Sequence, residues 1–158
     1  MYRKVQDFLA DWSAQAEGMI QVLEAMTDDK LDQAIVEGHS TLGWLGWHLA
    51  TTPGFFVGMV GAPIKTALNR NEVPTSAKEI AEGYKKVAEE VKTAVEQALT
   101  DEMLAETVES FRGPVPRGAL LRTLIDHQTH HRGQMTVLLR QAGLSVPGVM
   151  GPTKEQQA

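Results

Sequence analysis

Three of the five histidines lie within one short stretch, DHQTHHRGQ at residues 126–134. His127 and His131 are four residues apart, so on a helix their side chains project from one face, with Cβ atoms about 5–6 Å apart. Two imidazoles at this spacing can bind the same metal ion. Because the chain contains no cysteine, its metal ligands would have to be nitrogen or oxygen atoms. The pair therefore indicates a candidate metal site.

A third histidine, His48, interrupts the apolar face of another predicted helix, four residues after Trp44. Imidazoles are costly to bury without partners, and more costly to bury when protonated. One divalent metal ion bound by His48, His127 and His131 would satisfy all three. Three neutral histidines leave at least one coordination position free, as in catalytic zinc sites. Nitrogen ligands alone leave zinc, nickel, iron, cobalt and copper open.

The neighbours of the histidine pair limit the chemistry. Gln128, rather than Glu, follows the first histidine, so the zinc-protease motif is absent. Asp126 and His130 each lie about 100° around the helix from the ligand beside them. We therefore expect no general base from Asp126 and expect His130 beside the site. Taken alone, His48 could instead be an ordinary core histidine.

Several further side chains have two readings. Trp44 could line a substrate pocket or belong to the core. Gln134, three residues after His131, could hydrogen-bond a ligand imidazole or be an exposed polar residue. Arg132 and Arg140 could bind an anionic substrate, or be solvated near the end of their helix.

Four segments with apolar residues at spacings of three and four must position these residues. The predicted helices cover 2–26, a segment from an N-cap at Ser40 to about 58–61, a segment from a cap at Ser76, and 117–141. Proline and asparagine between 62 and 75 predict a long connection, and we find no strand-like alternation. The sequence predicts an all-α, four-helix bundle over 1–145, with a long crossover between helices two and three, and an irregular tail over 146–158.

Composition and the N-terminal sequence limit which binding partners and which cellular location we expect. With 158 residues, 42% of them hydrophobic, the chain can bury one core. A net charge of -5 with no basic patch argues against nucleic acid as a partner. The N-terminus lacks a secretory signal, and the apolar stretch over 42–62 contains His48 and Pro53, so we expect a cytoplasmic protein with no membrane span.

Two motifs carry a family resemblance. The segment STLGWLGWHLA at residues 40–50, followed by DHQTHHRGQ at 126–134, resembles the DinB-like (DinB/YfiT-type) family of bacterial four-helix-bundle metalloproteins over roughly 1–145. The resemblance implies that His48, His127 and His131 are the metal ligands, with zinc or nickel the first candidates. It also implies a frequent homodimer. Characterised relatives include metal-dependent thiol transferases and hydrolases that act on small-molecule conjugates.

Two functions from different classes remain open at this point. In the first, the protein is a metal-dependent transferase or hydrolase whose open three-histidine site acts on a small molecule. In the second, it is a noncatalytic metal-binding bundle that acts in sensing or protein association. A closed metal site with no adjoining cavity would favour the second.

Overall fold

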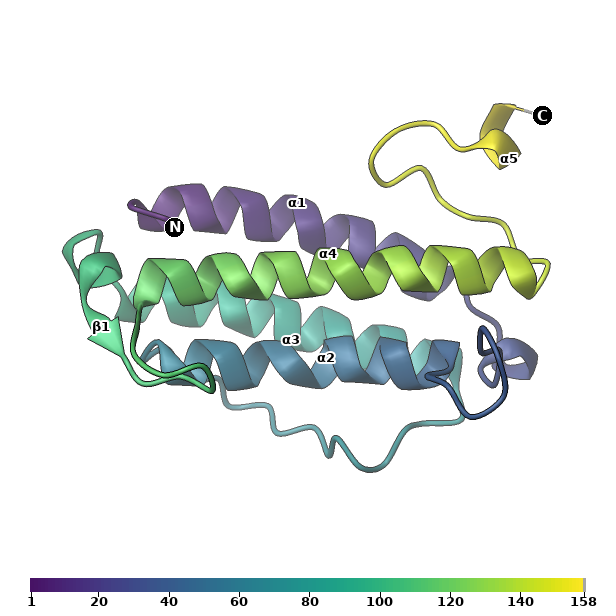
Figure 1. Ribbon diagram of the computed structural model, residues 1–158, viewed down its shortest axis with the longest axis horizontal. Coiled ribbons are helices and arrows are strands. Elements are labelled where there is room, and N and C mark those ends of the chain that lie inside the picture. Colours follow the sequence, from purple (N-terminus) through teal and green to yellow (C-terminus); the bar gives the residue numbers. More distant parts are fainter. Residues whose placement is uncertain (158) are drawn as a thin grey trace.

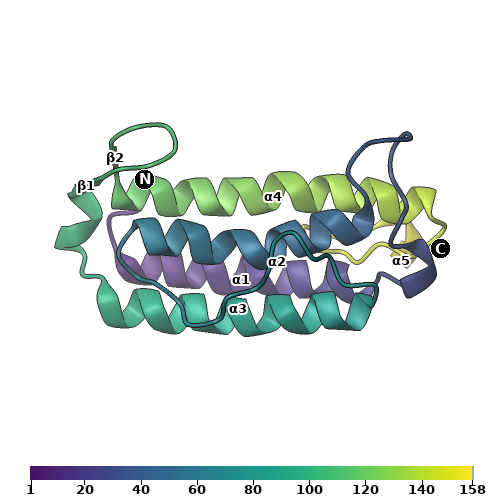
Figure 2. The same cartoon turned by 90° about the horizontal axis from the view of Figure 1, so that it is seen from below.

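Four long helices form a single bundle in the computed structural model, which describes residues 1–157. They are α1 (Val5–Glu24), α2 (Leu42–Met59), α3 (Ala77–Ala98) and α4 (Arg117–Gln141). Both α1 and α2 pack mainly against α3 and α4, so α1 lies diagonally across the bundle from α2 (Figures 1 and 2). The predicted all-α bundle is confirmed.

The connection between α2 and α3 is the predicted long crossover. Both helices run in the same direction, so residues 60–76 return along the bundle, over α2 and α3 (Figure 2). The Trp47 Nε1–H donates to the carbonyl of Asn69 at 2.8 Å. The hydroxyl of Thr66 donates to Glu90 at 2.6 Å. These hydrogen bonds attach the crossover to both helices that it joins.

The start of α2 differs by one residue from the sequence prediction. The N-cap is Thr41, whose hydroxyl accepts from the backbone N–H of Trp44 at 3.1 Å, and not Ser40. The preceding loop explains the shift, since carbonyl groups of that loop accept from the backbone N–H groups of Leu42 and Gly43, at 2.9 Å each. Thr41 then satisfies the next free amide of the helix.

The other predicted helix ends agree closely with the structure. Ser76 caps α3 by accepting from the N–H of Glu79 at 3.3 Å. Gly143 follows α4 with a φ of 75°, the left-handed conformation that suits glycine after a helix. The first helix begins later than predicted, at Val5, whose N–H is bound by the carboxylate of Asp101 at 2.8 Å.

The chain outside the long helices contains short regular elements that the sequence did not predict. Between α3 and α4 lie the 3-10 helix η2 (Glu102–Ala105) and a β-hairpin. Its strands, β1 (Thr107–Val108) and β2 (Val115–Pro116), are two residues long each. A strand of two residues is too short to produce a detectable alternation. A further 3-10 turn, η1 (Asp28–Lys30), follows α1.

The C-terminal tail contacts the bundle. It contains one short helix, α5 (Lys154–Gln157), and the Arg140 guanidinium pairs with Glu155 at 2.8 Å. Val146 is buried. The division of the chain at residue 145 stays a prediction, and Ala158 lies outside the described residues. Within residues 1–157, no helix is long and apolar enough to cross a membrane.

Candidate metal centre

His48 of α2 and His127 and His131 of α4 converge in the structure. One nitrogen from each ring can be chosen so that the three atoms all lie within 4.8 Å of one another. The Nε2 atoms of His48 and His127 are 3.1 Å apart. The cluster forms because α2 and α4 are neighbours and because the i, i+4 spacing places the α4 pair on one side of that helix.

The histidines lie at the edge of the core. All three side chains are half-buried, whereas Leu124 and Met135, on the same stripe of α4, are fully buried. The sequence placed the three imidazoles within the apolar core, and this is corrected. On α4, the row of residues that includes the histidines leaves the core along the seam between α2 and α4. This seam faces the viewer in Figure 1.

Neighbouring side chains select the tautomers of two imidazoles. The Oε1 of Gln134 can only accept, so the Nδ1 of His131, 2.7 Å away, must donate to it. Thr52 uses its proton in a 2.6 Å hydrogen bond to the carbonyl of His48. Its oxygen can therefore accept from the Nδ1 of His48 at 3.4 Å. In the neutral tautomer that these contacts favour, the lone pair of each ring lies on Nε2, the arrangement that binds a metal.

The third imidazole is less well satisfied. The Nδ1 of His127 is buried and has no hydrogen-bond partner within residues 1–157. Burial, with the nearby His131 and Arg70, lowers the pKa of His48 from 6.5 to about 4. Burial, with the neighbouring histidines, lowers the pKa of His127 to about 4 as well. Both rings are therefore neutral at pH 7, as metal ligands must be.

These observations fit a divalent transition metal. Two nitrogens 3.1 Å apart correspond to ligands about 2.0–2.1 Å from one ion, at an angle of about 100°. Three uncharged nitrogen donors suit zinc, nickel, cobalt, iron or copper, whereas magnesium and calcium prefer oxygen. The cluster could thus hold one such ion.

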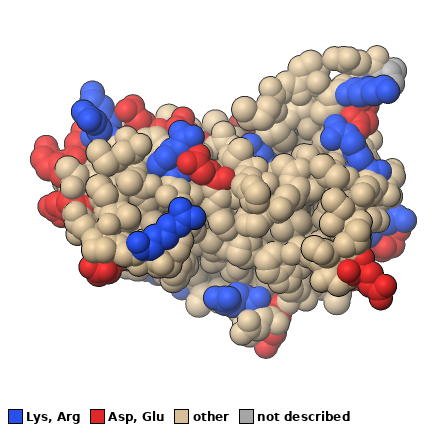
Figure 3. Space-filling view, in the orientation of Figure 1, with Lys and Arg blue, Asp and Glu red and all other residues tan. Residues whose placement is uncertain are grey.

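A cavity of about 510 Å³ opens beside the histidines. Its walls include His48, His127 and Trp44, and the Trp44 ring stacks on His48 with a centroid distance of 4.8 Å and an interplanar angle of 7°. The central part of this face is occupied by uncharged residues (Figure 3). A volume of this size is typical of small-molecule sites.

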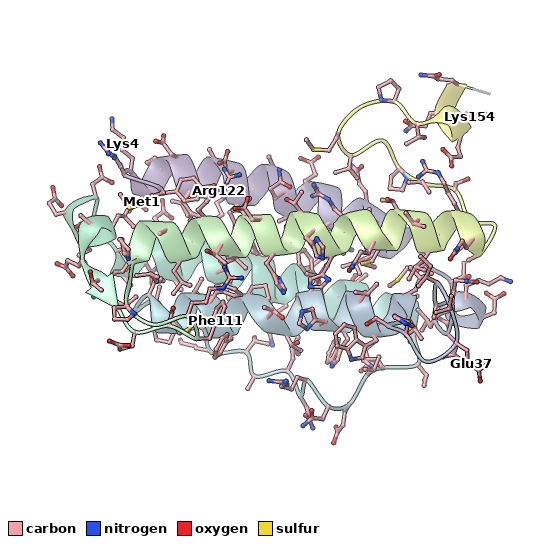
Figure 4. All side chains as sticks on the ribbon, viewed as in Figure 1. Met1, Lys4, Glu37, Phe111, Arg122 and Lys154 are labelled. Atoms are coloured by element: carbon pink, nitrogen blue, oxygen red, sulfur yellow. The ribbon has the colours of Figure 1, made fainter. Side chains whose placement is uncertain are left out.

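Phenylalanines from two separate segments form an aromatic part of the cavity wall. Phe55 and Phe56 come from α2, and Phe111 comes from the loop between β1 and β2. Phe111 contacts Phe56 edge to face with a centroid distance of 5.7 Å. Figure 4 labels Phe111 on the same face as the α2–α4 seam. Phe55 itself is 58% exposed.

Other predicted candidates lie outside the histidine cluster. His130 is exposed on α4, with its ring centroid 5.0 Å from that of His131. Asp126 is exposed and pairs with Arg122 at 2.8 Å. Arg140 pairs with the tail, as described above. None of these side chains lines the cavity.

Arg132 fits neither of its sequence interpretations. Only 3% of it is exposed, and its guanidinium donates to the carbonyl of Gln15 at 3.1 Å. The buried Tyr84 hydroxyl donates to Gln128, one turn earlier on α4, at 2.6 Å. Arg132 therefore belongs to a polar group inside the bundle and has no contact with the cavity.

Sequence reasoning missed three residues that shape the site. Thr52 lines the cavity, and its position four residues after His48 was a usable signal. Arg70 and Phe111 also line the cavity. They belong to irregular connections whose path no periodicity predicts.

Comparison with known proteins identifies the family. A model of the DinB family matches residues 1–158. The chain belongs to the DinB family. Among curated proteins, it is 38% identical to the uncharacterized protein YrdA of Bacillus subtilis (strain 168), covering 100% of this chain and 95% of that protein.

Solved structures agree with membership of the DinB family. A DinB-like protein from Bacillus cereus ATCC 10987 is 42% identical, with a TM-score of 0.89 over 94% of this chain and 99% of the other. The DinB-like protein YjoA of Bacillus subtilis has a TM-score of 0.73 at 20% identity, over 92% and 99% of the two chains. The second similarity shows the fold alone.

Proposed function

We propose that this DinB-family protein is a metal-dependent enzyme that acts on a small molecule, as a thiol transferase or a hydrolase. Its ligands are His48, His127 and His131. The observation that carries the proposal is the convergence of these imidazoles beside an open cavity of about 510 Å³. A purely structural metal site would be closed by a fourth protein ligand. The cavity therefore favours catalysis over the noncatalytic alternative.

The chain's own residues prepare the site before substrate arrives. Gln134 and Thr52 hold the Nδ1 protons of His131 and His48, so each ring presents a lone pair. Trp44 stacks on His48 and limits rotation of that ring. A divalent ion bound there supplies Lewis-acid chemistry, which polarises a carbonyl and lowers the pKa of a thiol or of water.

The cavity lining favours thiol transfer over hydrolysis. No aspartate or glutamate lines it among residues 1–157, so the walls offer no carboxylate as general base. A thiol has an unperturbed pKa of about 8.5, whereas that of bulk water is about 15.7. A thiol nucleophile therefore needs far less help from a base than water does.

We propose zinc or nickel as the ion, with iron, cobalt and copper also compatible with three nitrogen donors. We further propose a cytoplasmic homodimer that does not bind nucleic acid. Exposed apolar side chains at Ile35, Val36 and Val137 support self-association, since contiguous apolar surface commonly marks an interface. The net charge of -5 opposes binding to a polyanion.

The function is tested by turnover with defined ions. Chelator-treated full-length protein is reloaded with zinc or nickel and assayed with cysteine and 1-chloro-2,4-dinitrobenzene, and separately with ester and amide substrates. We expect metal-dependent thiol transfer that is lost in His131→Ala and kept in His130→Ala. Metal-loaded protein with no turnover above the metal-free control in either assay would contradict an enzymatic role.

A further inference from the structure

We propose that Arg70 is the anion-binding residue of the cavity, and that the substrate is a carboxylate attached to an apolar or aromatic body. The role of the cavity as a substrate site rests on the proposed function. The assignment of Arg70 rests on three observations. These are the residues that line the cavity, the hydrogen bonds that hold the crossover, and the absence of an acidic partner for Arg70 within residues 1–157.

The walls of the cavity differ in chemical character from place to place. Phe55, Phe56 and Phe111 contact one another and form an aromatic part of the wall, whereas Arg70 and Asn71 come from the crossover. Arg70 is the only lysine, arginine, aspartate or glutamate among the lining residues. A molecule that fills this cavity therefore meets aromatic carbon at one part of the wall and a positive charge at another.

The backbone beside Arg70 is held in place. The carbonyl of Asn69 accepts from the indole of Trp47 at 2.8 Å and from the N–H of Glu72 at 3.2 Å. The Asn69 side chain accepts from the N–H of Asn71 at 3.1 Å. Arg70 thus lies within a turn that is attached to α2 one residue before His48. Its distance from the histidine cluster is set by this attachment.

The indole of Trp47 is fixed in turn by its contact with α3. A Cβ added at Gly83 would lie 2.9 Å from the Trp47 ring, so only glycine allows this approach without displacement. The ring is buried. Trp47 therefore connects the packing of α2 against α3 with the position of the turn that carries Arg70.

The guanidinium of Arg70 has no carboxylate within 4 Å in residues 1–157, so no acidic side chain there neutralises its charge. Arg117, Arg122 and Arg140 are each paired with an acidic side chain, whereas Arg3, Arg112 and Arg132 are, among the described residues, unpaired like Arg70. A single guanidinium can bind both oxygens of one carboxylate through parallel hydrogen bonds. A phosphate dianion would call for a second cationic side chain, and none lines the cavity among residues 1–157. These two observations favour a carboxylate as the anion.

The inference is tested with a pair of probes that differ only in charge. Full-length metal-loaded protein is titrated with 4-phenylbutyrate and with 4-phenylbutyramide, following tryptophan fluorescence, because Trp44 lines the cavity. The same titrations are repeated with chelator-treated protein, in which the carboxylate has no metal ion to bind. We expect the wild type to bind the carboxylate about tenfold more tightly than the amide in both forms.

Two variants that each remove one positive charge distinguish a specific contact of Arg70 with the carboxylate from a general effect of charge. Arg70→Gln should lose most of the preference for the carboxylate. Lys65→Gln, which removes the same charge from the crossover outside the cavity, should keep it. An unchanged preference in Arg70→Gln, or no preference in the wild type, would overturn the inference. An Arg70-dependent preference in a protein that cannot be reloaded with metal would support the inference and reject the proposed function.

Discussion

Two pairs of polar residues on the same turns of α4 have opposite surroundings. His127 and His131 face the α2 seam and are half-buried, and His127 lines the cavity. Gln128 and Arg132, each one residue later, are almost fully buried within the bundle. Both pairs have i, i+4 spacing. A rotation of about 100° around the helix axis therefore separates a candidate binding site from an internal polar group.

The two pairs also differ in how their polar atoms are used. The inner pair is bound to other helices, through Tyr84 of α3 and the carbonyl of Gln15 in α1. The outer pair directs ring nitrogens toward His48. Within residues 1–157, each pair leaves one buried nitrogen without a partner, on Gln128 and His127. Among the same residues, the outer pair alone belongs to a cluster of imidazole nitrogens that an ion could join.

The largest expected effect concerns the stability that the inner pair provides. Arg132→Ala removes a buried side chain and its hydrogen bond to Gln15, and should lower the free energy of unfolding by about 2–4 kcal/mol. Urea denaturation of the metal-free protein measures this. The folded fraction should still bind metal normally. A variant that keeps wild-type stability but loses metal would reverse the proposed roles of the two pairs.

A smaller effect is expected for Gln134, which is hydrogen-bonded to His131 of the outer pair. Gln134→Ala removes the acceptor for the Nδ1 proton of His131, and should weaken metal affinity about 10- to 100-fold. Competition with a chromophoric zinc chelator measures the affinity. Gln141→Ala, an exposed substitution at the end of the same helix, is the matched control. Equal affinities in the two variants would show that the Gln134 contact does not orient the ligand.

The smallest expected effect concerns Thr52. Its oxygen is 3.4 Å from the Nδ1 of His48, a longer contact than the one made by Gln134. Thr52→Val should weaken metal affinity by about threefold to fivefold, since longer hydrogen bonds contribute less. Thr51→Val is the control, because Thr51 bonds only to backbone carbonyls. A loss as large as that in Gln134→Ala would contradict the ranking by distance.

The sequence predicted what depends on local spacing. Helical periodicity defined the four helices, and the i, i+4 rule paired His127 with His131. His48 was matched to them because it lies in a largely apolar helix and because the family resemblance implies all three histidines together. Ser40 and Thr41 are both good caps, so only the loop that binds the next two amides decides between them.

The remainder depends on contacts between segments far apart in the chain. Arg132 reads as a surface residue by type, yet it continues a buried stripe of α4 that includes Leu121, Ile125, Gln128, Met135 and Leu139. This wider stripe was visible in the spacing, although the partner Tyr84 was not. Arg70 lies in the cavity wall because hydrogen bonds to Trp47 and Glu90 hold the crossover, and no local pattern encodes these contacts.

The most direct test is the metal content of tag-free protein, measured by plasma mass spectrometry in the wild type, His131→Ala and His130→Ala. The two variants delete neighbouring imidazoles of the same helix, and only His131 belongs to the cluster. We predict about one transition-metal ion per chain in the wild type and in His130→Ala, with almost none in His131→Ala. A wild type that stays metal-free after incubation with zinc or nickel, or equal metal in all three proteins, would contradict the three-histidine site.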